Sequence, residues 1–179
     1  MNIFVTDACP VMSAQALDNV RVNKMILESA QMLSTAMSVN GAAPSSLPKS
    51  KAGNPFKPTH ANHPCTKWVT DNRDNYWWLY LHLEALLFEY NHRTGKTHSC
   101  ESTLSSLSIG YGMIPQVGTG LSEFQNSSGM DTGNVLTSYQ DCMNAKWAKD
   151  VIKVKWTNRN PPAWITISVH QVGDVWYRS

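Results

Sequence analysis

The segment from residue 21 to residue 33 constrains the fold more than any other part of the chain. Its apolar side chains recur every three or four residues, a spacing that places them on one face of an α-helix. The residues that share this face are Val22, Met25, Ile26, Ala30, Leu33, Ala36 and Met37. We therefore predict a long buried helix over residues 20–39, which the pair Asn40-Gly41 ends.

A second stripe on the same helix is polar and consists of Arg21, Lys24, Glu28 and Gln31. Glu28 follows Lys24 by one helical turn and Arg21 by two, so we expect both cations to favour the ionised carboxylate. Such a carboxylate could stabilise a developing positive charge or orient a nucleophile. The alternative is a solvated helix face with one ion pair, which stabilises a helix by only about 0.2–0.5 kcal/mol. The pattern alone leaves both interpretations open.

A second long helix is predicted over residues 73–91, with Gly95 at its C-terminal end. Its apolar stripe consists of Tyr76, Leu79, Tyr80, Leu83, Leu86, Leu87 and Tyr90. We expect the two long helices to pack together at the centre of the core. We also expect Trp77, Trp78 and Phe88 to pack in this core or in a smaller apolar cluster beside it, with a stacking role as the alternative.

Shorter elements complete the expected fold. They are two helices with Pro10 and Pro64 in their first turns, helices at residues 98–107 and from Asp131 or Thr132, and short strands at residues 2–6 and 165–172. A chain of 179 residues is long enough to bury a core of its own. The sequence thus predicts a mainly α-helical, single-domain fold over residues 1–179.

Two long loops are expected between these elements. Residues 42–58 are rich in Pro and Ser and carry Lys49, Lys51 and Lys57 without an acidic residue, whereas residues 108–130 are rich in Gly. Long loops in a compact domain are usually functional or disordered. The basic loop suits contacts with phosphate groups, but a plain flexible insertion explains it equally well.

Residues 146–159 have the pattern most typical of nucleic-acid binding. The basic residues are Lys146, Lys149, Lys153, Lys155 and Arg159. We expect them to contact phosphates, and we expect Trp156 and the nearby Trp164 to stack on bases. The alternative is a helix end whose lysines extend along apolar surface toward water.

Further candidates lie around the helix that begins at Pro64. His60, Asn62 and His63 are expected at its N-terminus, where free backbone N–H groups favour an anion. Arg73, at the start of the next helix, is another candidate for DNA binding. His60, His63 and Cys65 also resemble metal ligands, but a second ligand pair at standard spacing is missing. We therefore predict no metal and no cofactor.

Bulk properties limit the remaining classes. The net charge of +2 is too small to indicate nucleic-acid binding by itself. The chain has no CxxC motif, no apolar stretch of membrane-spanning length, and no basic start typical of a secretory signal. We expect reduced cysteines, a cytoplasmic location and no membrane association.

Five segments together resemble a widespread bacteriophage protein family over roughly residues 1–98. They are Met1–Val5, Arg21–Leu33, Thr59–Pro64, Asn75–Leu79 and Glu89–Lys96. The layout is also similar to that of phage pyrimidine-dimer DNA glycosylases of the endonuclease V type, which are small all-α proteins. In that resemblance Glu28 matches the catalytic Glu and Arg21 matches a His position. His63 starts the aromatic helix, and Pro161–Trp164 matches a C-terminal aromatic element.

The resemblance implies a glycosylase and abasic-site lyase acting on damaged or modified bases in double-stranded DNA. The nucleophile in those enzymes is the α-amine that becomes exposed when the initiator Met is removed. Asn2 is bulky and normally leaves Met1 in place, so the candidate amines here are Met1 and Lys24. Glu28 would stabilise the cationic sugar, with Arg21 beside it.

Two other classes stay open from the sequence. One is a non-catalytic module that binds phage or host nucleic acid through the same basic and aromatic surfaces. The other is a small phage factor that binds a host protein or a nucleotide, for example against host defence. All three classes place the protein in the cytoplasm of an infected bacterial host.

Overall fold

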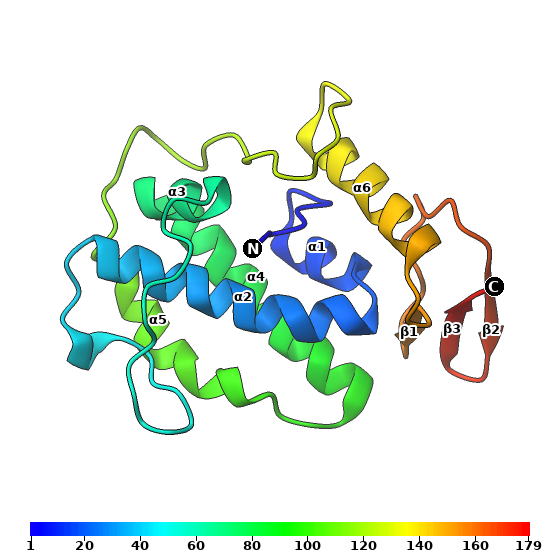
Figure 1. Ribbon diagram of the computed structural model, residues 1–179, viewed down its shortest axis with the longest axis horizontal. Coiled ribbons are helices and arrows are strands. Elements are labelled where there is room, and N and C mark those ends of the chain that lie inside the picture. Colours follow the sequence, from blue (N-terminus) through cyan, green and yellow to red (C-terminus); the bar gives the residue numbers. More distant parts are fainter.

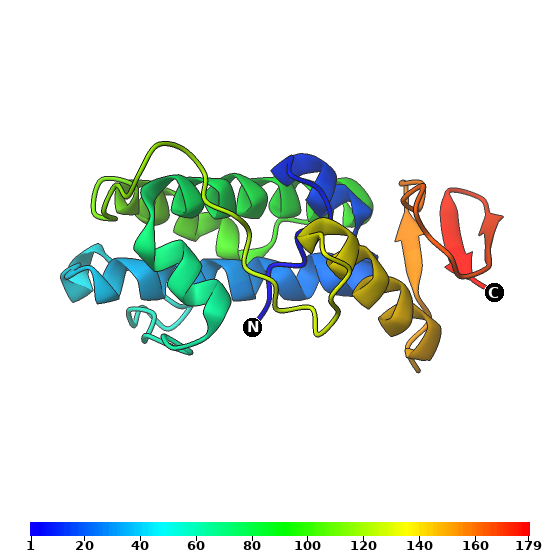
Figure 2. The same ribbon diagram turned by 90° about the horizontal axis from the view of Figure 1, so that it is seen from above.

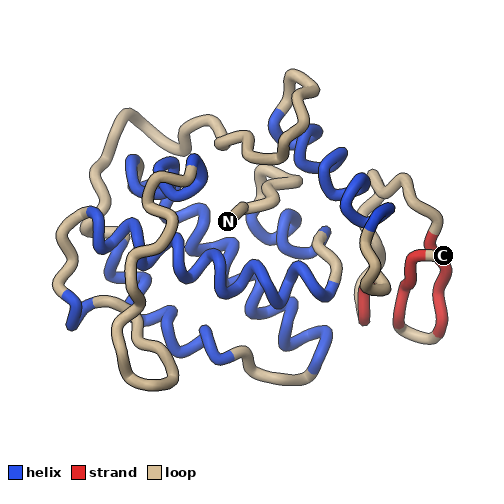
Figure 3. The backbone as a smooth tube through the Cα atoms, viewed as in Figure 1, coloured by secondary structure: helices blue, strands red, loops and turns tan.

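The computed structural model describes residues 1–179 and is mainly α-helical, as predicted. The α-helices are α1 (Pro10–Ala16), α2 (Asn19–Val39), α3 (Pro64–Asp71), α4 (Arg73–Thr94), α5 (Leu104–Gly110) and α6 (Val135–Lys149). Two short 3-10 helices cover Pro44–Ser46 and Ser99–Thr103, and the strands are β1 (Lys155–Thr157), β2 (Val169–Val172) and β3 (Val175–Arg178). The strands gather at the C-terminal end of the molecule (Figure 3).

The two long helices, α2 and α4, pack against each other at the centre of the molecule, as predicted (Figures 1 and 2). The Asp18 side chain caps α2 by accepting hydrogen bonds from the N–H groups of Val20 and Arg21. Gly95 ends α4 in the left-handed conformation, with φ at 67°. Helix α1 packs on α4, while α3 contacts both long helices and α5 contacts α2.

The N-terminal segment is buried but irregular, so the strand predicted at residues 2–6 is wrong. The Asn2 side chain accepts hydrogen bonds from the N–H groups of Ile3 and Phe4, at 2.8 Å and 3.0 Å. Phe4 has a φ of 43°, a left-handed conformation that bulky residues rarely adopt. These local bonds turn the chain away from the extended conformation and into the space between α2 and α6.

The C-terminal part consists of α6 and an antiparallel sheet with the strand order β1-β3-β2. Helix α6 is capped by Asn134 rather than by Asp131 or Thr132. The strand predicted at residues 165–172 is present only as β2. The sequence did not predict β1 and β3, whose three and four residues are too short to show a reliable alternating pattern.

The aromatic residues of α4 divide between core and surface. Trp78 is buried, and its indole N–H donates to the carbonyl oxygen of Ala8 at 2.7 Å. Trp77 is 38% exposed and packs in a small cluster, where its ring stacks on Tyr80 and meets the edge of Tyr111. The prediction of packing was wrong for Phe88, which is 66% exposed.

His82 of α4 is completely buried beside α1, and its ring stacks on Trp78. Its Nδ1 donates to the carbonyl oxygen of Pro10 at 2.9 Å, whereas its Nε2 has no partner. Burial lowers the pKa of His82 to about 4, because a charged ring would be poorly solvated there.

This histidine makes stability depend on pH. The unfolded chain binds the proton near pH 6.5 and the folded chain only near pH 4. Stability is therefore complete above about pH 6.5 and falls as the pH drops toward 4, by about 3 kcal/mol in total. Urea titrations across this window should show a shallower pH dependence for His82→Gln than for wild type. The exposed His170→Gln control should keep the wild-type dependence, and equal slopes for all three proteins would contradict the prediction.

No helix combines the length and the apolar character that a membrane span requires.

Candidate active site

Glu28 lies on the open side of α2 and contacts two amines. Its side chain is 17% exposed, so it is shielded but reachable. The Lys24 ammonium lies 3.5 Å from Oε1, and the α-amino nitrogen of Met1 lies 3.8 Å from Oε2. Both amines that the sequence analysis considered are therefore at the same carboxylate. Lys24 is 64% exposed, whereas the Met1 side chain is 3% exposed.

Several contacts fix the N-terminus in this position. The backbone N–H of Asn2 donates to Oε2 of Glu28 at 3.0 Å, and the Asn2 amide donates to the carbonyl oxygen of Ser127 at 3.0 Å. Thr66 lies 3.9 Å from the Met1 sulfur. Because residue 1 as a whole is only partly buried while its side chain is almost fully buried, its exposed surface is mainly on the backbone end. The buried side chain therefore anchors the residue, and the amine is held at Glu28.

A second layer supports this anchor. The Tyr139 hydroxyl donates to the carbonyl oxygen of Gln125 at 3.0 Å and accepts from the N–H of Ser127 at 3.1 Å. This fixes the loop whose Ser127 carbonyl holds Asn2. Burial raises the pKa of both Tyr139 and the neighbouring Cys65 thiol, so both groups are neutral at pH 7. No pattern in the sequence predicted the positioning roles of Asn2, Ser127 and Tyr139. The only signal was a polar Asn at the start of an apolar run.

His63 caps α3 close to the same site. Its Nδ1 accepts a hydrogen bond from the N–H of Cys65 at 3.2 Å, so the proton of the neutral ring is on Nε2. Partial burial lowers the pKa of His63, and repulsion from the N-terminal amine and His60 lowers it further, while Glu28 acts in the opposite direction. A neutral His63 can therefore donate a hydrogen bond from Nε2 to a group that enters the site.

Arg21 does not flank Glu28, and that prediction was wrong. Its guanidinium donates to Asp18 at 2.8 Å and to Asp150 at 2.7 Å. Burial favours a lower pKa for Arg21, but the two carboxylates outweigh it and raise the pKa. Asp18 also accepts the indole N–H of Trp147 at 2.8 Å. Arg21 therefore links the start of α2 to the end of α6. Its partner at the end of α6 is Asp150, which is distant in the sequence, and not Glu28, which helical spacing had suggested.

Two hollows lie along α2, one lined by residues before Glu28 and one by residues around it, although Glu28 itself lines neither. One, of about 370 Å³, is lined by Lys24 and by Lys146 of α6. The other, of about 480 Å³, is lined by Gln31 and by Lys57 of the basic loop. Lys24 and Gln31 are one turn before and one turn after Glu28, so the carboxylate lies between two hollows that each have a lysine on the rim.

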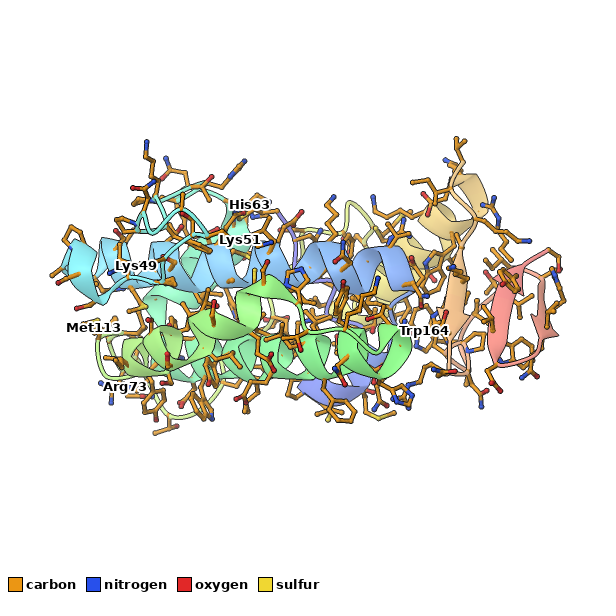
Figure 4. The ribbon with its side chains drawn as sticks, turned by 90° about the horizontal axis from the view of Figure 1, so that it is seen from below. Lys49, Lys51, His63, Arg73, Met113 and Trp164 are labelled. Carbon is orange, nitrogen blue, oxygen red and sulfur yellow. The ribbon has the colours of Figure 1, made fainter.

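Some of the residues predicted to bind DNA are exposed, and others make contacts within the protein. The exposed ones are His60, Asn62, Lys146, Lys149, Lys153 and Lys155. Lys49, Lys51 and His63 lie toward one side of the molecule, while Arg73 is at the opposite edge (Figure 4). Arg73 donates to the carbonyl oxygen of Ile114 at 3.2 Å, so the structure does not bring it to the Glu28 site.

The remaining candidates are occupied by contacts within the protein. Trp156 is fully buried and donates to the carbonyl oxygen of Ala16, which rules out the stacking role predicted for it. The Trp164 ring stacks on the Trp147 ring, with the two ring centroids 5.4 Å apart. Arg159 binds the buried carboxylate of Glu89 at 2.5 Å. These aromatic rings were assigned to bases because sequence alone does not distinguish a stacking platform from a core.

No group of three or more His, Cys, Asp or Glu side chains is arranged to hold a metal ion. All four cysteines are free, and Cys9 is the exposed one.

Comparison of the sequence with protein families gives a match. A family model for pyrimidine dimer DNA glycosylases matches residues 1–102, more than half of the chain. A helical fold with an amine held against a glutamate and this match define a protein of the DNA glycosylase class. The chain belongs to the pyrimidine dimer DNA glycosylase family. The similarity expected from the sequence is confirmed, whereas the bacteriophage origin stays a prediction.

Searches of the curated proteins and of the solved structures found no significant match. The matched residues include Glu28, Lys24 and the N-terminus, whereas α6 and the sheet lie outside them.

Proposed function

We propose that the protein is a DNA glycosylase and abasic-site lyase whose nucleophile is the α-amine of Met1. The observation that carries this proposal is the Met1 amine held 3.8 Å from the Glu28 carboxylate, by a side chain that is 3% exposed. Membership of the family supports the class of reaction and its DNA substrate. The protein would act on DNA during bacteriophage infection, in the cytoplasm of the bacterial host.

The first step is attack of the neutral amine on C1′ of the damaged nucleotide. The bond between C1′ and the base nitrogen breaks, and its electron pair leaves with the base. The attached amine then loses a proton, and its electron pair forms the C=N bond of an imine as the bond between C1′ and O4′ opens. The electron pair of that bond stays on O4′, which takes up a proton. Removal of a C2′ proton breaks the C3′–O bond and cleaves the strand.

Glu28 supplies the negative charge that these reaction steps need. Positive charge develops on the sugar as the base leaves, and a carboxylate beside the amine stabilises it. The same carboxylate can transfer protons during strand cleavage. Its limited exposure of 17% strengthens both effects, because less water screens the charge.

Met1 is favoured over Lys24 because its amine is held in place. The buried Met1 side chain and the Asn2 contacts fix the position of the amine, whereas Lys24 is 64% exposed. Pre-positioning lowers the entropic cost of attack.

The basic residues on both sides of Glu28 would hold the DNA backbone. Lys57, with Lys49 and Lys51 of the same loop, lies on one side, and Lys146 lies on the other. Phosphate contacts of this kind make binding strongly dependent on salt.

The proposal is tested by trapping the imine with borohydride. Wild type and Lys24→Ala would be incubated with UV-irradiated duplex, untreated duplex and duplex containing an abasic site. We expect a covalent adduct with the irradiated and abasic DNA, and none with untreated DNA, for both proteins. Loss of the adduct in Lys24→Ala would assign the chemistry to Lys24. No adduct on any substrate would favour the binding module, which salt-titrated DNA affinity would then test.

A further inference from the structure

The loop that joins α6 to β1, residues 150–154, exposes two aliphatic side chains that the catalytic proposal does not use. Val151 is fully exposed and Ile152 is 65% exposed, whereas Val154 is buried in the core. Single exposed apolar residues are common on protein surfaces. The surroundings of this pair therefore decide what it can do.

The loop is held firmly at both ends. The Asp150 carboxylate binds Arg21 at 2.7 Å, and the Asp150 carbonyl oxygen accepts from the Arg178 guanidinium at 2.7 Å. The Arg178 backbone N–H also donates to the carbonyl oxygen of Val154 at 3.0 Å. The loop therefore needs little ordering before the two side chains can enter an apolar environment.

Four exposed lysines flank the pair in the sequence: Lys146, Lys149, Lys153 and Lys155. The Lys153 ammonium lies 4.4 Å from the centre of the Tyr177 ring, which holds it beside the loop. Asp150 is the only acidic residue between positions 146 and 159, and Arg21 neutralises it. Exposed aliphatic side chains flanked by lysines are complementary to DNA, whose phosphates flank an apolar base stack.

The loop is also next to the Glu28 site. Val151 and Ile152 line the same hollow as Lys24, whose ammonium is 3.5 Å from Glu28. In Figure 1 the end of α6 and the start of β1 lie on the same side of α1 as the beginning of α2. Duplex DNA that places a sugar at Glu28 would bring a neighbouring base step to this loop.

We propose that Val151 and Ile152 form a wedge that enters the base stack of duplex DNA and unstacks the nucleotide presented to Glu28. The wedge rests on the proposed function for its chemical purpose. Its action is physical: the two side chains replace part of the lost stacking while the lysines hold the phosphates. Such wedges offset the free energy of unstacking a base, which enzymes acting on bases must supply.

The test compares Val151→Ser/Ile152→Ser with the control Ile109→Ser/Val117→Ser, whose aliphatic residues are 59% and 61% exposed elsewhere on the surface. The first probe is a duplex with 2-aminopurine beside a non-cleavable abasic analogue, in which fluorescence rises when the base unstacks. The second is borohydride trapping on UV-irradiated DNA as a duplex and as a single strand.

For the wedge variant we expect the fluorescence rise and the duplex adduct to fall by roughly tenfold or more, because nothing then offsets unstacking. Affinity for the duplex should change by less than about threefold, because the lysines remain. The single-strand adduct and every readout of the control variant should match wild type. The fluorescence probe needs no chemistry, so its result is independent of whether an imine forms.

Three outcomes would overturn the wedge. Wild-type fluorescence in the variant would show that the side chains do not enter the stack. Equal losses on duplex and single strand would show that the loop supports the active site instead. A change in sedimentation with unchanged fluorescence would identify a second copy of the chain as the occupant.

Discussion

Cleavage of abasic DNA falls by about 10²- to 10⁴-fold in the Glu28→Gln variant, the range expected when a positioned acid–base group is removed. The substitution keeps the shape of the side chain, and an amide oxygen can still accept from the N–H of Asn2. The N-terminal amine should therefore stay in place and still form some trapped adduct. What is lost is the charge that stabilises the sugar cation and the group that transfers protons.

The control is Glu101→Gln, an exposed carboxylate on the short helix Ser99–Thr103. Cleavage by this variant should match wild type on a 5′-labelled abasic duplex. Full cleavage activity in Glu28→Gln would remove Glu28 from the mechanism and leave the polar stripe of α2 as a structural feature.

Replacing Glu89 by Gln lowers the free energy of unfolding by about 3–5 kcal/mol, the range for breaking a buried ion pair from one side. Glu89 and Arg93 are 1% and 5% exposed, and the Arg93 Nε donates to Glu89 at 3.0 Å. Arg93 also donates to the carbonyl oxygens of Leu17 and Gln15. The network joins α4 to the connection between α1 and α2, and Arg159 extends it to the C-terminal part.

Burial lowers the pKa of Arg93 despite the neighbouring Glu89, which shows how poorly solvated this guanidinium is. Without the carboxylate, its positive charge would remain buried with only neutral partners. Urea unfolding of Glu89→Gln measures the effect, with Glu84→Gln as the control because Glu84 is an exposed carboxylate on the same helix. A loss below about 1 kcal/mol, as for an exposed pair, would contradict the prediction.

The sequence predicted the elements whose signals are local. The apolar faces of α2 and α4, the proline at the start of α3 and Gly95 at the end of α4 all depend on residues within a few turns of one another. The same holds for the approach of Lys24 to Glu28, because four residues span one helical turn.

Contacts between distant residues could not be predicted in this way. Arg21 pairs with Asp150, 129 residues away, rather than with Glu28 on its own helix. A tryptophan among basic residues looks the same in the sequence whether its ring stacks on a base or, like Trp156, fills the core. The meeting of the N-terminus with Glu28 depends on the irregular turn at Asn2 and on Ser127, which no periodic pattern reveals.

The most direct test of the amine mechanism is to locate the trapped DNA adduct by peptide mapping and tandem mass spectrometry. Wild-type protein would be trapped on an abasic duplex with borohydride and then digested with nuclease and protease. The expected result is a sugar remnant on the α-nitrogen of Met1, with an unmodified Lys24. A remnant on Lys24, or no modified peptide at all, would contradict the assignment of the nucleophile.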